Sequence, residues 1–258
     1  MNFLKALFGG TELSPEEEKE EAGRKQFDLM KYDGVKAMKM GQWDYAVRCF
    51  EEALKLQDDP EVHDYLSQTF IRLDRLDEAV EQLQWLTRKE PENEKLLLQL
   101  AHVYYMKEDY EGMGSSAERA IQLNAESAQA YYLYAQAALG QNDMINGIAR
   151  LTKAIALDEE LADARLLRAQ TLLKMGDVNG AADDSAWLME HVGEQEDVLM
   201  LASQVARAKG DDATAVELLK KALELNPFLL DKVSGDYEAE GIEEQTKRAY
   251  SMMNPFGI

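Results

Sequence analysis

The chain has 258 residues, of which 46% are hydrophobic and 30% are charged, a composition typical of a folded soluble domain. Its formal net charge of −21 argues against nucleic acid and anionic membrane surfaces as partners, because both attract cationic proteins, and it permits a basic partner. A single cysteine, Cys49, excludes an intramolecular disulfide and a cysteine metal cluster, and we expect it to be buried.

The first 14 residues are predicted to form a short apolar segment and a linker. An apolar stripe at helical spacing consists of Phe3, Leu4, Leu7 and Phe8. Gly9 and Gly10 separate this stripe from the rest, so we expect residues 1–12 to be mobile. No apolar run approaches the roughly 18 residues of a membrane span. The start also lacks the long apolar stretch and the small-residue cleavage site of a signal peptide, so we expect a cytoplasmic protein.

A long first helix is predicted from Pro15 to Met40. Ser14 has the character of an N-cap, Pro15 suits the first helical position, and Glu17 can reach back to the cap.

From residue 27 to residue 227 the sequence repeats itself. Small residues recur at Gly34, Ser67, Ala101, Ala135, Ala169 and Ser203. A second column is Ala46, Ala79, Met113, Gly147, Ala181 and Ala215, and a third is Ala53, Leu86, Ala120, Ala154, Leu188 and Ala222. Each step is 34 residues except the first, which is 33. This period is typical of arrays built from one supersecondary unit, in which small residues let paired helices approach closely.

Two helical patterns flank a turn in each unit. The predicted turns are Gly41-Gln42, Asp74-Arg75, Glu108-Asp109, Asn142-Asp143, Gly176-Asp177 and Gly210-Asp211. Gly, Asn and Asp suit the left-handed backbone that ends a helix, and Asp or Asn can cap the next one. After Pro227 the segment FLLDKV is predicted to cover the last repeat. A further helix is predicted over Glu238 to Met253, because the end of an array must hide its core face.

These units resemble the tetratricopeptide repeat (TPR) family. The resemblance is carried in the first unit by Gly34, Ala37, Trp43, Ala46, Phe50 and Ala53. In the third unit it is carried by Leu97, Ala101, Tyr104, Tyr110 and Ala120, and in the sixth by Ala215, Leu219, Ala222 and Pro227. Met113 and Gly147 depart from the alanine column of the family. The resemblance implies an all-α fold, a right-handed α-solenoid of six helix-turn-helix repeats with terminal extensions.

The resemblance also implies a division of the chain. The predicted segments are 1–14 (apolar segment and linker), 15–59 (extended first helix and repeat 1), 60–93 (repeat 2), 94–127 (repeat 3), 128–161 (repeat 4), 162–195 (repeat 5), 196–227 (repeat 6) and 228–258 (C-terminal cap).

In TPR arrays the first helix of each unit lines a concave groove. Here a column of mainly glutamine residues, together with the residues four before and three after each of them, shares one face of that helix. The predicted groove residues are Gln68, Ile71, Leu98, His102, Tyr105, Tyr132, Gln136, Leu139, Leu166, Gln170, Leu173, Met200 and Gln204. A carboxamide can both donate to and accept from a peptide unit, so a column of glutamines suits an extended peptide. The apolar columns favour partly apolar ligands, and Asp64, Asp163 and Asp197 favour ligands that carry Lys or Arg.

We therefore expect a non-enzymatic adaptor that binds a protein or peptide segment. The three histidines lie in different units, and no nucleotide, nucleophile, cofactor or metal motif is present. A clamp for a C-terminal carboxylate, as in chaperone-binding TPR proteins, would use Lys31 and Lys95. Two alternatives remain open. The terminal stripe could make the chain a membrane-peripheral assembly factor, although two helical turns anchor weakly. The stripe could also dock in the groove of a second copy, which would make the chain a self-assembling structural protein.

The small-residue columns generate a first prediction. Ala181→Leu should lower the free energy of unfolding by roughly 1–3 kcal/mol, because the larger side chain overpacks the helix crossing. Urea unfolding followed by circular dichroism measures this change, and an unchanged midpoint would contradict close packing at this position.

Overall fold

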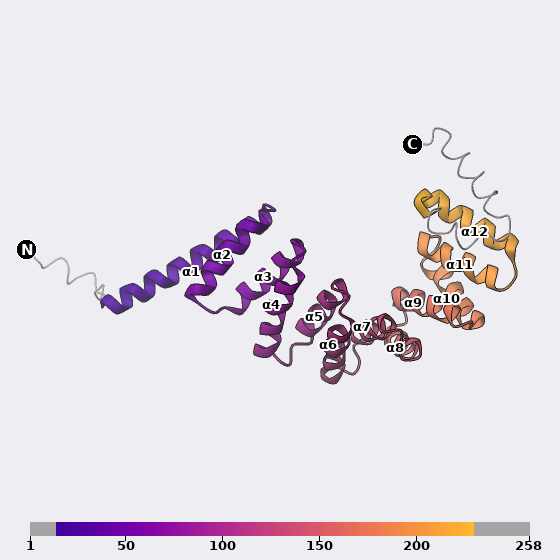
Figure 1. Cartoon of the computed structure of the whole chain (residues 1–258), viewed down its shortest axis with the longest axis horizontal. Coiled ribbons are helices and arrows are strands. Elements are labelled where there is room, and N and C mark those ends of the chain that lie inside the picture. The colour runs from indigo at the N-terminus through magenta and orange to yellow at the C-terminus, as the bar shows by residue number, and fades with distance from the viewer. Residues whose placement is uncertain (1–13, 230–258) are drawn as a thin grey trace, which may run out of the picture. The chain divides into compact units, whose positions relative to one another are not determined.

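The computed structural model describes residues 14–229, and these residues contain helices and no strands, which confirms the predicted all-α class. Figure 1 shows the helices in chain order. They are α1 (Pro15–Lys39), α2 (Trp43–Leu56), α3 (Pro60–Arg72), α4 (Leu76–Lys89), α5 (Glu94–Met106), α6 (Tyr110–Leu123), α7 (Ala128–Gly140), α8 (Met144–Leu157), α9 (Ala162–Lys174), α10 (Val178–His191), α11 (Glu196–Ala208) and α12 (Asp212–Leu225). A short 3-10 helix, Pro227–Leu229, follows. None of the described helices is long and apolar enough to cross a bilayer.

The chain divides into two compact units, Met1–Asp109 and Tyr110–Ile258. In the described part of the first unit, α1 packs on α2, α2 on α3, α3 on α4 and α4 on α5. In the second unit each helix from α6 to α12 likewise packs on the next one along the chain, and α9 also contacts α11. Neighbours in sequence are therefore neighbours in space within each unit (Figure 1).

All six predicted turns adopt the left-handed backbone at their first residue. The φ angles are 69° at Gly41, 57° at Asp74, 57° at Glu108, 63° at Asn142, 85° at Gly176 and 80° at Gly210. At each turn the next residue donates its backbone N–H to a carbonyl five residues earlier, as Gln42 does to Ala37 over 2.9 Å. This is the Schellman arrangement, and it satisfies carbonyl groups at the end of each first helix.

The predicted helix caps are confirmed at the start of α1 and at three second helices. The backbone N–H of Ser14 donates to Glu17 Oε2 (2.7 Å), and that of Glu17 donates to Ser14 Oγ (3.3 Å), which forms a capping box. A carboxylate from Asp143, Asp177 or Asp211 accepts a backbone N–H in the first turn of α8, α10 or α12 respectively.

The three small-residue columns are buried throughout, which confirms their role at helix crossings. Gly34 shows why the residue must be small, since a Cβ placed there would lie 2.5 Å from the ring of Phe50. Met113, a departure from the alanine column, is also fully buried. Cys49 is buried in the first unit, as predicted.

The far end of the second unit is covered as expected for the first residues after α12. Leu229 is buried against Leu199, Leu219 and Leu223. The apolar stripe from Phe3 to Phe8, the mobility expected for residues 1–12 and the helix expected at Glu238–Met253 lie outside the described residues.

The left-handed turns generate a second prediction. Glu108→Gly should raise the free energy of unfolding by about 1 kcal/mol, because an L-residue is strained at positive φ and glycine is not. Gly176→Ala should lower the free energy of unfolding by a similar amount. A Cβ there meets no atom within 4 Å, so the change acts only through the strain of positive φ in the backbone. Chemical denaturation measures the change in the free energy of unfolding of each variant. Changes of the same sign would be inconsistent with backbone strain as the cause.

Candidate functional site

The predicted groove residues lie on the first helices of their pairs, and the unit boundary separates them into two sets. The first unit holds Gln68 and Ile71 on α3 and Leu98, His102 and Tyr105 on α5. The second unit holds Tyr132, Gln136 and Leu139 on α7, Leu166, Gln170 and Leu173 on α9, and Met200 and Gln204 on α11.

In the first unit the polar members of the set are exposed. Gln68 donates its side-chain amide to Asp64 Oδ2 over 2.8 Å. Burial raises the pKa of the Asp64 carboxyl despite this hydrogen bond and the nearby charge of Lys95. His102 and Tyr105 stack with ring centroids 6.4 Å apart, and Tyr105 is 43% exposed. This part of the surface is therefore aromatic and polar, with one partly buried carboxyl.

In the second unit the glutamine column remains accessible. Gln170 and Gln204 are exposed, and Gln136 is half-buried, with its Nε2 donating to the hydroxyl of Tyr132 over 3.2 Å. The helix that carries Gln136, α7, contains no charged residue. The carboxamides thus stand among uncharged side chains on α7 and beside charged ones only on α9 and α11.

The apolar members of this second set are only half exposed. Tyr132 packs partly against the core that contains Tyr131 and Leu151, and Met200 packs against Leu199. Leu166 packs against the cluster that contains Leu188 and Leu201. Each of these side chains therefore also helps to hold its helix on its neighbour.

Leu139 on α7 lies against Gly147 on α8. A Cβ built at Gly147 would lie 2.4 Å from Leu139 Cδ2, so the missing side chain leaves a notch on α8 that Leu139 fills. The space left by the departure of Gly147 from the alanine column is thus occupied by Leu139 on the facing helix.

One of the two residues that match a carboxylate clamp, Lys31, is already paired with carboxylates of its own chain. Lys31 pairs with Asp59 (3.2 Å) and Glu61 (2.5 Å). Burial alone would lower the pKa of Lys31, but hydrogen bonds to the two carboxylates outweigh it and raise the pKa. The positive charge of Lys31 is therefore compensated by Asp59 and Glu61 within the first unit. This argues against a clamp that uses Lys31 to bind a C-terminal carboxylate.

A buried ion pair holds the middle of the second unit together. Arg168 on α9 makes two hydrogen bonds to the Asp184 carboxylate on α10, Nε to Oδ2 at 2.8 Å and Nη2 to Oδ1 at 2.7 Å, and its Nη1 reaches Thr152 on α8. The guanidinium of Arg165 lies 4.1 Å from the ring of Trp187, which stacks on His191. These contacts join α8, α9 and α10. Holding the helices together is sufficient to explain them, and no binding role is needed. Within the described ranges no group of His, Cys, Asp and Glu has the geometry to hold a metal ion.

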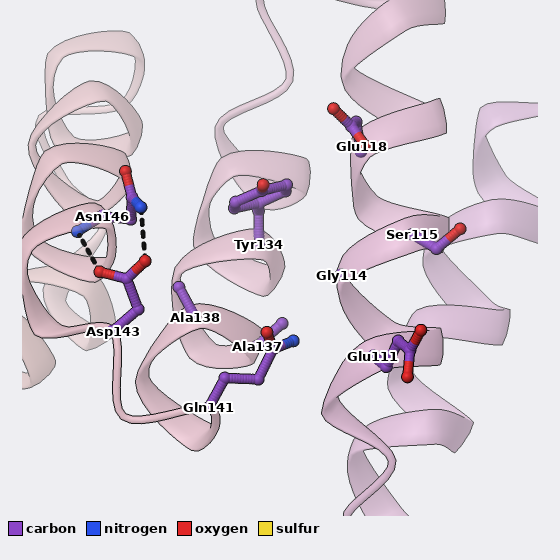
Figure 2. Close-up of a pocket in the computed structure, with 10 residues that line it drawn as sticks. All are labelled: Glu111, Gly114, Ser115, Glu118, Tyr134, Ala137, Ala138, Gln141, Asp143 and Asn146. Atoms are coloured by element: carbon purple, nitrogen blue, oxygen red, sulfur yellow. Dashed lines mark hydrogen bonds between the residues drawn. The ribbon is translucent and has the colours of Figure 1, made fainter.

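A hollow lies in the second unit, between α6, α7 and the start of α8, away from the predicted groove residues. It has a volume of about 230 Å³. Figure 2 shows Glu118 and Glu111 on α6 to either side of Gly114, with Tyr134 and Gln141 opposite on α7. The signal for it in the sequence is a glycine at residue 114, where four of the five other repeats have valine or isoleucine and one has alanine.

Comparison with known proteins agrees with the repeat geometry. A family model described as Tetratricopeptide repeat matches residues 196–228. No curated protein matches the chain by sequence. The last repeat of the chain therefore matches the TPR family by sequence. The fold of the chain is similar to that of solved TPR structures whose sequences are 16% to 23% identical to it.

Three of these structures illustrate the likeness. PilF of Pseudomonas aeruginosa has a TM-score of 0.61 at 16% identity, with 88% of this chain and 99% of that chain covered. MamA from residue 41 to the end, from Desulfovibrio magneticus RS-1, has a TM-score of 0.60 at 20% identity, with 66% and 97% covered. YrrB, described as a TPR protein with an unusual peptide-binding site, has a TM-score of 0.55 at 19% identity, with 69% and 92% covered.

The notch at Gly147 generates a third prediction. Gly147→Ala should lower the free energy of unfolding by about 1 kcal/mol, because the crowding of Leu139 exceeds the gain in helix propensity. Gly114→Ala is the matched control, since its Cβ would meet Ala137 at an ordinary 3.5 Å, and it should gain up to about 1 kcal/mol. Urea denaturation compares the two, and equal gains would show that Leu139 does not depend on the notch.

Proposed function

We propose that this TPR protein is a non-enzymatic scaffold that binds an extended segment of a partner protein. The proposed site is the surface made by Tyr132 and Gln136 on α7, Leu166 and Gln170 on α9, and Met200 and Gln204 on α11. Repeat arrays of this kind present extended surfaces for binding. The TPR fold of the chain and of its structural neighbours supports an interaction role.

The observation that carries the proposal is the way polar and apolar side chains share this surface. On each of the three helices a glutamine is accompanied, four residues earlier, by a half-buried Tyr132, Leu166 or Met200. Side chains four apart lie on the same face of a helix. A segment lying across these helices therefore meets an amide and an apolar contact on each one.

The chemistry of the surface favours an extended peptide over a helix. Each glutamine can donate to and accept from a peptide unit, and each such hydrogen bond contributes about 0.5–1.5 kcal/mol. An extended segment leaves its backbone groups free for these bonds, whereas a helix uses them internally. The half-exposed apolar side chains would then select the residues of the segment.

Charge at the edge of this surface favours a partner with basic residues. Asp163 and Asp197 are exposed near the starts of α9 and α11, three residues before Leu166 and Met200. Exposed carboxylates attract Lys and Arg and speed encounter at low salt more than they strengthen the complex. The expected ligand is therefore an extended segment with apolar residues beside lysine or arginine.

The test replaces the apolar contacts. Tyr132→Ser combined with Leu166→Ser should weaken binding by roughly 2–4 kcal/mol, which is below the total for two fully buried side chains because both are already half-buried. Gln136→Ala with Gln170→Ala should cost about 1–3 kcal/mol. The partner is identified by quantitative pull-down from source cells with the parent chain as bait. Isothermal titration calorimetry then gives its affinity for each variant.

Controls are needed because Tyr132 and Leu166 also touch the core. Each variant must keep its helical circular dichroism at the assay temperature. Ile145→Ser is the matched control, since Ile145 is a 74% exposed apolar residue on α8, away from the proposed surface, and it should leave the affinity unchanged. A folded Tyr132/Leu166 variant that binds the partner as tightly as the parent would refute the proposal.

A further inference from the structure

The hollow between α6 and α7 lies on a different side of α7 from the surface proposed above. Tyr134, Ala137, Ala138 and Gln141 line it, and their spacing of three and four puts them on one face of the helix. Tyr132 and Gln136 belong to another face. The hollow is therefore a separate feature, and its use does not depend on the proposed function.

The hollow lies where two small residues, Gly114 on α6 and Ala138 on α7, line the space between the helices. Gly114 occupies a position that in the other repeats is taken by Val47, Val80, Ile148, Ala182 and Val216. Ala138 occupies a position taken elsewhere by Ala37, Phe70, Tyr104, Leu172 and Ala206. Helices α6 and α7 nonetheless pack on each other. Large side chains occupy both positions where α4 meets α5 (Val80, Tyr104) and where α8 meets α9 (Ile148, Leu172), whereas between α6 and α7 the space is left open to solvent.

The walls of the hollow carry negative charge. Glu111 and Glu118 on α6 are exposed and flank Gly114, and Asp143 lies at the start of α8 (Figure 2). No lysine, arginine or histidine lines the hollow. Arg150 does not line the hollow, but its guanidinium lies 4.7 Å from the ring of the lining residue Tyr134.

The lining also offers hydrogen-bond acceptors at fixed positions. Gln141 Nε2 donates to the backbone carbonyl of Tyr110 over 2.9 Å, which anchors the amide and leaves its Oε1 as an acceptor. The Asp143 carboxylate already holds the backbone N–H of Asn146 at 3.1 Å. The hollow therefore combines two exposed carboxylates with two anchored acceptor groups.

From this geometry we propose that the hollow between α6 and α7 receives an arginine side chain of a partner protein. Its volume of about 230 Å³ is below the roughly 300–1,000 Å³ of small-molecule sites and suits one side chain. Carboxylates from two helices and the Gln141 oxygen match the several donors of a guanidinium. The planar fork of arginine can bond two acceptors at once, whereas a lysine ammonium is a compact, strongly hydrated charge.

The experiment uses N-acetyl-arginine N-methylamide as the probe, titrated at low ionic strength into the 15N-labelled full chain. The backbone amides of Gly114 and Asn146 report on the hollow. The amide of Gly180, which holds the same cap position on α10, is the internal control. We expect saturable shifts at Gly114 and Asn146, none at Gly180, and several-fold weaker binding of the lysine analogue. Absence of saturable shifts, or equal binding of the lysine analogue, would overturn the proposal.

Two variants separate the hollow from bulk charge. Glu111→Gln with Glu118→Gln should weaken probe binding at least about tenfold, because two charge-assisted hydrogen bonds are lost. Glu126→Gln with Glu160→Gln removes the same charge from exposed positions outside the hollow and should leave binding unchanged. An equal loss in both pairs would show that the probe senses only net charge.

A third variant tests shape without changing charge. Gly114→Val introduces the residue found at this position in three other repeats, so the fold should tolerate it, and it should fill the hollow and abolish the saturable shifts at Asn146. Unchanged circular dichroism confirms folding. Binding that survives in this folded variant would overturn the proposed location. The Tyr132/Leu166 variant should bind the probe like the parent, so this proposal and the proposed function can fail independently.

Discussion

The close approach of two helices at residues with almost no side chain is the constraint on which the rest of the structure depends. Gly34 leaves only enough room for the ring of Phe50, and Ala181 and Ala215 are fully buried at the equivalent crossings. Dispersion contacts weaken steeply with distance, so helices held this close gain packing that a larger residue would prevent. The left-handed turn that follows each first helix brings its partner back at the distance this packing needs.

Because each first helix must pack on a partner, its remaining surface is shared between the interior and the solvent. Tyr132, Leu166 and Met200 each contact a core cluster and remain partly exposed. In the proposed binding surface, side chains held by the core in this way would lose less conformational entropy on association. The same arrangement couples binding to stability, since a change at Tyr132 affects both.

Departures from the repeat pattern have two different consequences in this protein. At Gly147 the loss of a side chain is compensated by Leu139, and the interior stays filled. At Gly114 no larger residue on the facing helix compensates, since Ala137 and Ala138 are also small, and a hollow remains. A missing side chain therefore creates a space only when the neighbouring helix is also short of volume at that point.

The local parts of this structure could be predicted from the sequence because they depend on neighbouring residues. The turns at Gly41, Asp74 and Glu108, the cap at Ser14 and the pairing of helices all follow from contacts within one or two repeats. The sequence also indicated which face of each first helix carries the glutamines. It could not show that Leu139 turns into the notch of Gly147 or that Lys31 is neutralised by Asp59 and Glu61, because these depend on the volumes and charges that a facing helix supplies. The hollow at Gly114 required the tertiary structure for the same reason, since a space between two helices is set by both sets of side chains together.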